Sequence, residues 1–205
     1  MSIAGVIAAL DWWAVATDRR DIERWAKPAV MVFLIVAAVL IPAESDGIRW
    51  WIVIGLAFGL VGDVLLFFDR FIPGAAAFLV GHLAYVVALL LVAREPRGLL
   101  VGGVIVLLVA VFVGRQIVAG AWAKAPILGA IVAAYMLVIG VVVVLAVGST
   151  SLVVAIAALL FLTSDALLAW ARFVGPAPGG RVTVMVTYQL AQAGFVLAIP
   201  TLAMA

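Results

Sequence analysis

The sequence is a succession of long apolar segments joined by short polar connections. Most segments run for about 16–23 residues, the length that an α-helix needs to cross about 30 Å of hydrocarbon. Hydrophobic residues make up 69% of the chain, whereas soluble domains contain about 45–50%. None of the segments shows the alternating pattern of a barrel strand. The sequence therefore predicts an all-α integral membrane protein.

Eight segments are predicted to span the membrane as helices, within a single domain that covers residues 1–205. The predicted spans are Ser2–Thr17, Lys27–Ile41, Arg49–Asp69, Pro73–Arg94, Gly98–Val118, Pro126–Val147, Leu152–Arg172 and Val182–Leu202. The connections between them are short.

Basic residues are distributed unevenly among these connections. Three of them, Arg49, Arg94 and Arg97, follow even-numbered spans. Nine follow odd-numbered spans: Arg19, Arg20, Arg24, Lys27, Arg70, Arg115, Lys124, Arg172 and Arg181. By the positive-inside rule the connections after odd-numbered spans are predicted to be cytoplasmic, with both termini on the opposite side. We expect the protein in the cell membrane.

The chain contains an internal similarity. Residues 62–71 and residues 164–173 share the pattern small-Asp-x-Leu-Leu-x-aromatic-x-Arg-Phe. Because the two copies lie four spans apart, a duplication with halves 1–97 and 98–205 would relate them as parallel repeats. Chance similarity between apolar helices is the alternative.

Two carboxylates, Asp63 and Asp165, lie inside otherwise apolar spans, and a duplication would bring them face to face. An ionisable group at such a depth costs several kcal/mol unless it faces a partner or a wet cavity, so intramembrane carboxylates usually have a function. Counted at about 1.5 Å per residue from the predicted cytoplasmic helix ends, both lie in a layer roughly 9–18 Å below the membrane boundary. The other polar residues of this layer are Asp11, His82, Tyr85, Tyr188 and Gln192.

This pair of carboxylates suits acid–base catalysis. Burial and mutual repulsion favour a state in which one carboxyl group holds a proton while the other is ionised. We predict that His82 orients one of them or relays its proton. A metal site of one histidine and two aspartates would need more ligands than this layer offers, so neither a metal nor a cofactor is expected. Ser164 adjoins Asp165 on one helix and does not face it, which argues against Ser–His–Asp catalysis.

Composition also limits the partners. The chain contains no cysteine, which excludes disulfides, thiolate catalysis and thiolate metal sites. It has no basic stripe of the kind that binds nucleic acids, so the expected partners are membrane lipids and a lipid substrate. The sequence leaves the oligomeric state open.

Five groups of residues resemble the YhhN family of membrane lysoplasmalogenases, and the resemblance covers most of the chain. They are Lys27-Pro28, Gly62–Leu66, Phe78 with Gly81–Tyr85, Ser164–Ala169, and Tyr188 with Gln192. The resemblance implies an eight-helix enzyme that hydrolyses the vinyl ether bond of lysoplasmalogens, giving a fatty aldehyde and a glycerophospho-base without a cofactor. It also implies that Asp63 and Asp165 are catalytic.

Four further residues are candidate contacts for a lysophospholipid substrate. Tyr85, Tyr188 and Gln192 are predicted to face inward, and a structural hydrogen bond is the alternative for each tyrosine. Lys27 is a candidate contact for the lipid phosphate. The arginines Arg70 and Arg172 are others, unless all three only extend to the membrane boundary as topology signals.

A second class of function would use the same aspartates. A proton-coupled transporter could employ Asp63 and Asp165 as a relay. Transporters often contain helices that are broken near the middle of the membrane, and the central segments here lack an obvious Gly-Pro interruption, which favours an enzyme. A non-catalytic scaffold with a lipid-filled cavity is a third interpretation, and it leaves the carboxylates without a role.

Overall fold

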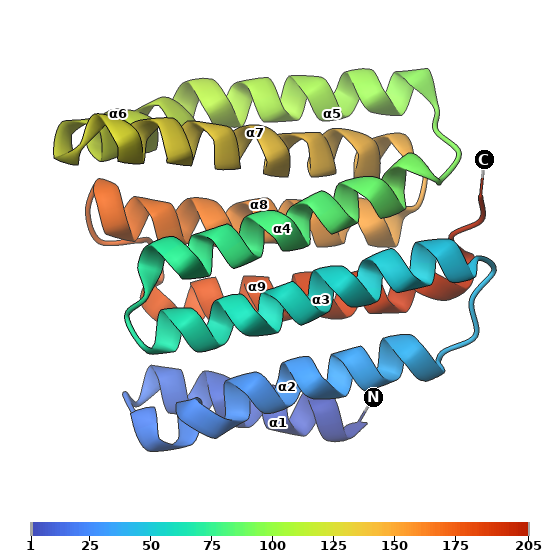
Figure 1. Ribbon diagram of the computed structural model, residues 1–205, viewed down its shortest axis with the longest axis horizontal. Helices are drawn as coiled ribbons and strands as arrows, with labels where there is room; N and C mark the ends of the chain where they lie inside the picture. The colour runs from blue at the N-terminus through green and yellow to red at the C-terminus, as the bar shows by residue number, and fades with distance from the viewer. Residues whose placement is uncertain (1, 205) are drawn as a thin grey trace.

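The computed structural model describes the backbone of residues 2–204 and the side chains of residues 4–204 as a bundle of helices (Figure 1). The bounds are α1 Ser2–Ala16, α2 Arg20–Leu40, α3 Asp46–Phe67, α4 Phe71–Leu90, α5 Pro96–Val109, a π-helical turn Ala110–Gly114, α6 Arg115–Lys124, α7 Pro126–Gly148, α8 Leu152–Phe173, α9 Gly180–Ala198 and a final 3₁₀ turn Ile199–Thr201. Helices α5 and α6 form one continuous helix through the π-helical turn. The described residues therefore contain eight long helices, which agrees with the number of predicted segments.

Six of these helices are long and apolar enough to cross a membrane, which indicates an all-helical membrane protein. They are α3, α4, the continuous helix α5–α6, α7, α8 and α9. Helix α1 has a shorter apolar stretch, Ala4–Ala16, and α2 begins with a strongly charged segment. The prediction of eight spans is thus supported for six helices and stays a prediction for α1 and α2.

Two helices extend beyond the predicted segments. Helix α2 begins at Arg20 and not at Lys27, so that Pro28 lies within it. The helix that was expected to end at Val118 continues to Lys124. The predicted boundaries marked the change from polar to apolar side chains, whereas backbone hydrogen bonds carry a helix into a charged segment regardless of polarity.

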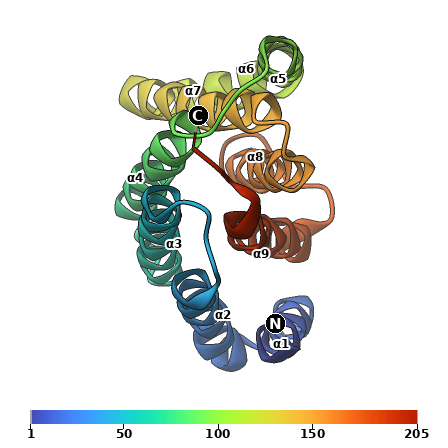
Figure 2. The same ribbon diagram turned by 90° about the vertical axis from the view of Figure 1, so that its right-hand side faces the viewer.

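The packing of the helices brings the two halves of the chain together. Both termini lie at the same end of the bundle (Figure 1). Viewed along the helices, α1 to α4 form an arc with α8 and α9 on its concave side (Figure 2). Helix α9 packs against α1, α2, α3 and α8, and α4 packs against α7. Each half therefore contributes side chains to the surroundings of the other half.

Glycines on one side of α3 make room for aromatic residues of neighbouring helices. A Cβ atom at Gly55 would overlap the ring of Tyr85, and one at Gly59 would lie 3.1 Å from the Tyr188 hydroxyl oxygen. The absence of side chains at these two positions allows tyrosines from α4 and α9 to pack against α3, with Tyr188 beside Asp63.

Candidate active site

The first polar cluster surrounds Asp63 near the end of α3. Its Oδ1 atom lies 2.9 Å from the Nζ atom of Lys27 on α2. Its Oδ2 atom accepts a hydrogen bond of 2.9 Å from the hydroxyl group of Tyr188 on α9. The side chains of Asp63 and Lys27 are 1% and 15% exposed, so this is an almost fully buried ion pair.

The second cluster surrounds Asp165 on α8. Its Oδ2 atom accepts a hydrogen bond of 2.9 Å from the hydroxyl group of Tyr135 on α7, and lies 3.3 Å from the Nε2 atom of His82 on α4. The histidine is buried, whereas the Asp165 side chain is 14% exposed. Among the described residues, no lysine or arginine lies within ion-pair distance of Asp165, which separates it from Asp63.

The 3.3 Å contact between His82 Nε2 and Asp165 is not a hydrogen bond in this structure, and its character depends on where the protons lie. The Nδ1 atom of His82 lies 2.7 Å from the carbonyl oxygen of Phe78, which only accepts hydrogen bonds, so Nδ1 is the donor. A neutral imidazole then carries no proton on Nε2. Two acceptors do not bind each other. The pair is therefore favourable when either the Asp165 carboxyl group or the His82 ring holds an additional proton.

Aromatic rings lie between the two clusters. The ring of Phe161 on α8 lies 4.5 Å from the ring of His82 and 5.6 Å from the ring of Tyr188, centroid to centroid. The ring of Phe78 lies 5.8 Å from that of Tyr188. The structure thus brings both aspartates into one aromatic core, but each has its own set of polar partners.

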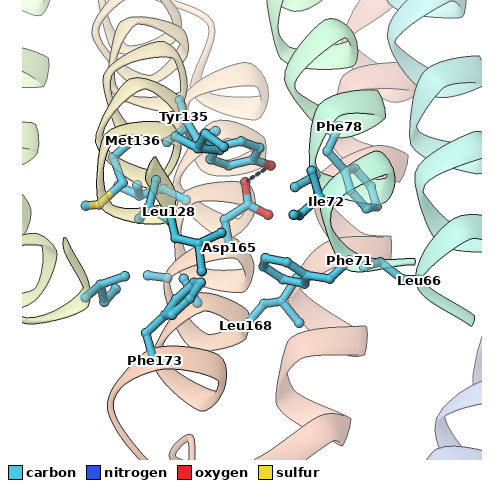
Figure 3. A pocket seen from close by; sticks show the side chains of 18 of the residues that line it. Leu66, Phe71, Ile72, Phe78, Leu128, Tyr135, Met136, Asp165, Leu168 and Phe173 are labelled. Atoms are coloured by element: carbon cyan, nitrogen blue, oxygen red, sulfur yellow. Dashed lines mark hydrogen bonds between the residues drawn. The ribbon is translucent and has the colours of Figure 1, made fainter. Parts of the chain in front are cut away.

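The second aspartate lines a small apolar cavity of about 80 Å³, which we call the Asp165 cavity. Its walls come from helices α3 to α8, and they include Phe71, Phe78, Met136 and Phe173. Figure 3 shows the Asp165 carboxylate and the Tyr135 hydroxyl group facing each other among these apolar side chains. A reactive carboxyl group in apolar surroundings suits a hydrophobic substrate.

Two further cavities adjoin the Asp165 cavity. A charged cavity of about 460 Å³ lies between α2, α3, α8 and α9, and it shares Leu66 and Leu168 with the Asp165 cavity. An apolar groove of about 580 Å³ lies along α5, α6 and α7, and it shares Val109, Met136 and Leu162. The Asp165 cavity therefore stands between a polar space and an apolar one.

The remaining predicted site residues form a separate pair. The hydroxyl group of Tyr85 donates a hydrogen bond to Oε1 of Gln192, and the Tyr85 ring stacks on Phe195 at 4.3 Å. Both polar side chains are fully buried, and neither lines the three cavities described above. As substrate contacts they stay predictions, since their observed contacts join α4 to α9.

A third buried carboxylate, Asp11 on α1, takes part in neither cluster. Its Oδ2 atom accepts a hydrogen bond of 2.6 Å from Gln189 on α9, whose Oε1 atom accepts one of 2.8 Å from Trp12. These contacts attach α1 to α9. Over residues 4–204, His, Asp and Glu side chains form no group of three that could hold a metal ion.

Sequence reasoning missed Tyr135 and Phe161. Tyr135 lies in an otherwise apolar segment nine residues after Pro126, which is the same layer as the other polar residues, so the depth argument applied to every tyrosine would have found it. Phe161 carries no such signal, because phenylalanine is common in any apolar helix. Its place between His82 and Tyr188 follows only from the packing of α4, α8 and α9.

Comparisons with known proteins identify the family of this chain and no individual relative. Searches of curated proteins and of solved structures found no match. The model of the YhhN family matches residues 22–199, a range that includes Asp63, Asp165 and the side chains that contact them. Since the match extends over most of the chain, this protein belongs to the YhhN family.

Proposed function

We propose that this protein is a membrane hydrolase that cleaves the vinyl ether bond of lysoplasmalogens. The observation that carries the proposal is the contact between Asp165 and His82 at the wall of an apolar cavity. Vinyl ether hydrolysis begins with protonation of a carbon atom by an acid, and a protonated carboxyl group in apolar surroundings can supply the proton. The association of the YhhN family with lysoplasmalogenase activity supports the same reaction.

In the first step, Asp165 donates its proton to the β-carbon of the vinyl ether. The electron pair of the carbon–carbon double bond forms the new C–H bond, and the α-carbon becomes part of an oxocarbenium ion. The ionised Asp165 carboxylate then lies beside this cation and stabilises it. His82 and Tyr135 hold the carboxylate in position through their contacts with Oδ2.

In the second step, water attacks the α-carbon and loses a proton to a base, for which we assign Asp63. The resulting hemiacetal breaks its bond to the glycerol oxygen, which receives the proton from Asp63. The hydroxyl group of the hemiacetal becomes the aldehyde carbonyl and gives its proton to Asp165. Lys27 contacts Asp63 and also lines the charged cavity. Water that entered this cavity would therefore be separated from Asp63 by the Lys27 side chain.

The contacts of the two aspartates support the predicted duplication. Asp63 binds one residue of the preceding helix, Lys27, and one residue of the last helix of the other half, Tyr188. Asp165 does the same with Tyr135 on the preceding helix α7 and with His82 on α4, the last helix of the first half. Two halves related by a twofold axis along the membrane normal would produce this reciprocal pattern.

The test is aldehyde release by purified protein from lysoplasmenyl lipids, with lysoacyl lipids of the same chain length as the comparison. We expect release from the vinyl ether lipid only, and loss of it in Asp63→Asn and Asp165→Asn. The matched control is Asp21→Asn, because Asp21 is an exposed aspartate of α2. Unchanged activity in both site variants would refute the catalytic assignment.

The same preparations can decide between hydrolysis and transport. Protein in liposomes that moved protons across the bilayer, and released no aldehyde from any vinyl ether lipid, would favour the relay function. Under that outcome the two aspartate variants should abolish proton movement, while Asp21→Asn should retain it.

A further inference from the structure

The charged cavity carries side chains of both signs at the end of the bundle that is rich in arginine. Arg20, Lys27 and Arg181 line it together with Glu23 and Asp69. The Nζ atom of Lys27 is already paired with Asp63. A ligand that enters this cavity therefore meets guanidinium groups and carboxylates side by side, as a head group with a phosphate and an amine requires.

Arg181, at the beginning of α9, is held in a fixed position. Its Nη2 atom lies 2.7 Å from both carboxylate oxygens of Glu23. Its Nη1 atom lies 3.2 Å from Oδ1 of Asp18. Glu23 is buried, while the Arg181 side chain is 52% exposed. A guanidinium group has five N–H donors, so part of this group stays available for phosphate oxygens.

The charged cavity adjoins the Asp165 cavity. Leu66 of α3 and Leu168 of α8 line both. On one side of these two leucines the lining is charged, and on the other side it is apolar apart from Asp165 and Tyr135. A single-chain amphiphile matches this sequence of surfaces, with its polar part in the first cavity and its chain in the second.

We propose that the charged cavity binds the phosphate-bearing head group of a single-chain lipid and that Arg181 is the principal phosphate contact. This inference rests on the proposed function, since it names the binding site of the same substrate. It replaces Lys27 in that role, because the Lys27 side chain is paired with Asp63 and only 15% exposed, whereas the Arg181 side chain is 52% exposed. Arg70 and Arg172 do not line the cavity.

The test measures binding and not hydrolysis, so that it remains informative if no aldehyde is released. The probes are a saturated alkyl ether lysolipid with a phosphoethanolamine head group, which has no vinyl ether to cleave, and the matching alkylglycerol, which has no phosphate. Arg181→Ala alone would leave the buried Glu23 carboxylate unpaired, so the main variant is Arg181→Ala with Glu23→Gln. Dissociation constants are measured in nanodiscs by tryptophan fluorescence.

We expect the double variant to bind the phospholipid probe about tenfold more weakly, as the loss of a charge-assisted hydrogen bond predicts, and the alkylglycerol without change. Glu23→Gln alone keeps Arg181 and an amide oxygen that can still accept its hydrogen bond, so it should lose less binding to the phospholipid probe than the double variant does and should bind the alkylglycerol like the wild type. Arg172→Ala is the matched control for an arginine at the same end of the bundle, and it should bind both probes normally.

Three results would overturn the inference. An equal loss for both probes would make Arg181 a purely structural residue, and so would the same loss in Glu23→Gln alone. A phosphate-dependent loss in Arg172→Ala would place the head group elsewhere. Displacement of the phospholipid probe by inorganic phosphate at equal concentration would identify a site for the free ion instead of a lipid head group.

Discussion

The two aspartates occupy the same position in two copies of one helical motif, yet their surroundings differ. Asp63 is paired with an ammonium group and is almost fully buried. Asp165 contacts an imidazole and a phenol, and it faces an apolar cavity. The motif fixes where each carboxyl group lies, whereas the partners from α2, α4, α7 and α9 determine its charge balance. Under the proposed function the two carboxyl groups would therefore take two roles, with Asp165 as the proton donor and Asp63 as the ionised base.

The largest expected effect is the loss of aldehyde release in Asp165→Asn. An amide cannot donate a proton to carbon, so we expect aldehyde release to fall by about a thousandfold or more. The free energy of unfolding should change little, because no lysine or arginine of the described residues is paired with this carboxylate. Release is measured with a coupled aldehyde dehydrogenase, and unfolding is followed by circular dichroism in detergent.

The assignment of roles to the two aspartates would be wrong if Asp165→Asn kept its activity while Asp63→Asn lost it. The donor role would then belong to the aspartate that is paired with lysine. His82→Gln tests whether Asp165 needs a protonatable neighbour, since glutamine keeps a polar group at this position but cannot take up a proton. We expect a loss of aldehyde release smaller than that of Asp165→Asn.

The next effect concerns the stability of the Lys27–Asp63 pair. Removing one member of a buried ion pair leaves the other charge without compensation, which is strongly destabilising. Lys27→Met and Asp63→Asn should each lower the free energy of unfolding by about 3 kcal/mol. The double variant should recover much of that loss, because no unpaired charge remains, and a double-mutant cycle measures the coupling.

Additive losses in this cycle would contradict a direct ion pair. The matched comparison is the exposed pair Arg19–Asp21, which lies at the same end of the bundle. Exposed pairs contribute about 0–1 kcal/mol, so the same cycle at that site should show almost no coupling.

The two tyrosines that donate to the carboxylates offer a smaller and more selective test. Tyr135→Phe removes a hydrogen bond from a carboxylate that has no cation, while Tyr188→Phe leaves Asp63 with Lys27. We expect aldehyde release to fall by about tenfold in Tyr135→Phe, in line with the loss of one hydrogen bond to a charged group. The loss in Tyr188→Phe should be smaller. Equal losses would show that Lys27 does not compensate for the missing hydroxyl group.

Sequence reasoning found the helical fold and the central ionisable residues for one physical reason. Long apolar segments have few structures open to them in lipid, and a charged residue within such a segment is rare enough to be noticed. Asp63, Asp165 and His82 were identified in this way, and the structure places all three in the polar clusters.

The choice of partners did not follow from the sequence. Lys27 was predicted to contact the lipid phosphate, and only the packing of α2 on α3 brings its ammonium group to Asp63. His82 follows Asp63 by one helix, yet it contacts Asp165. Such pairings depend on the rotation of each helix about its axis and on contacts between the two halves, which segment lengths and residue spacing do not determine.

The smallest expected effect shows which of the two cavities holds the hydrocarbon chain of the substrate. Met136 lines the Asp165 cavity and the apolar groove, while Met185 lines the charged cavity. If the hydrocarbon chain lies on the Asp165 side, Met136→Phe should narrow its path and shift the ratio of kcat/KM toward shorter chains by about threefold. This is less than the roughly 10–200-fold that one methylene is worth in an apolar pocket, because the Asp165 cavity adjoins a second apolar groove. Met185→Phe is the matched substitution on the Lys27 side, and it should leave the chain-length ratio unchanged. A shift in chain preference with Met185→Phe and none with Met136→Phe would place the chain beside Lys27, and it would exchange the roles of the two aspartates.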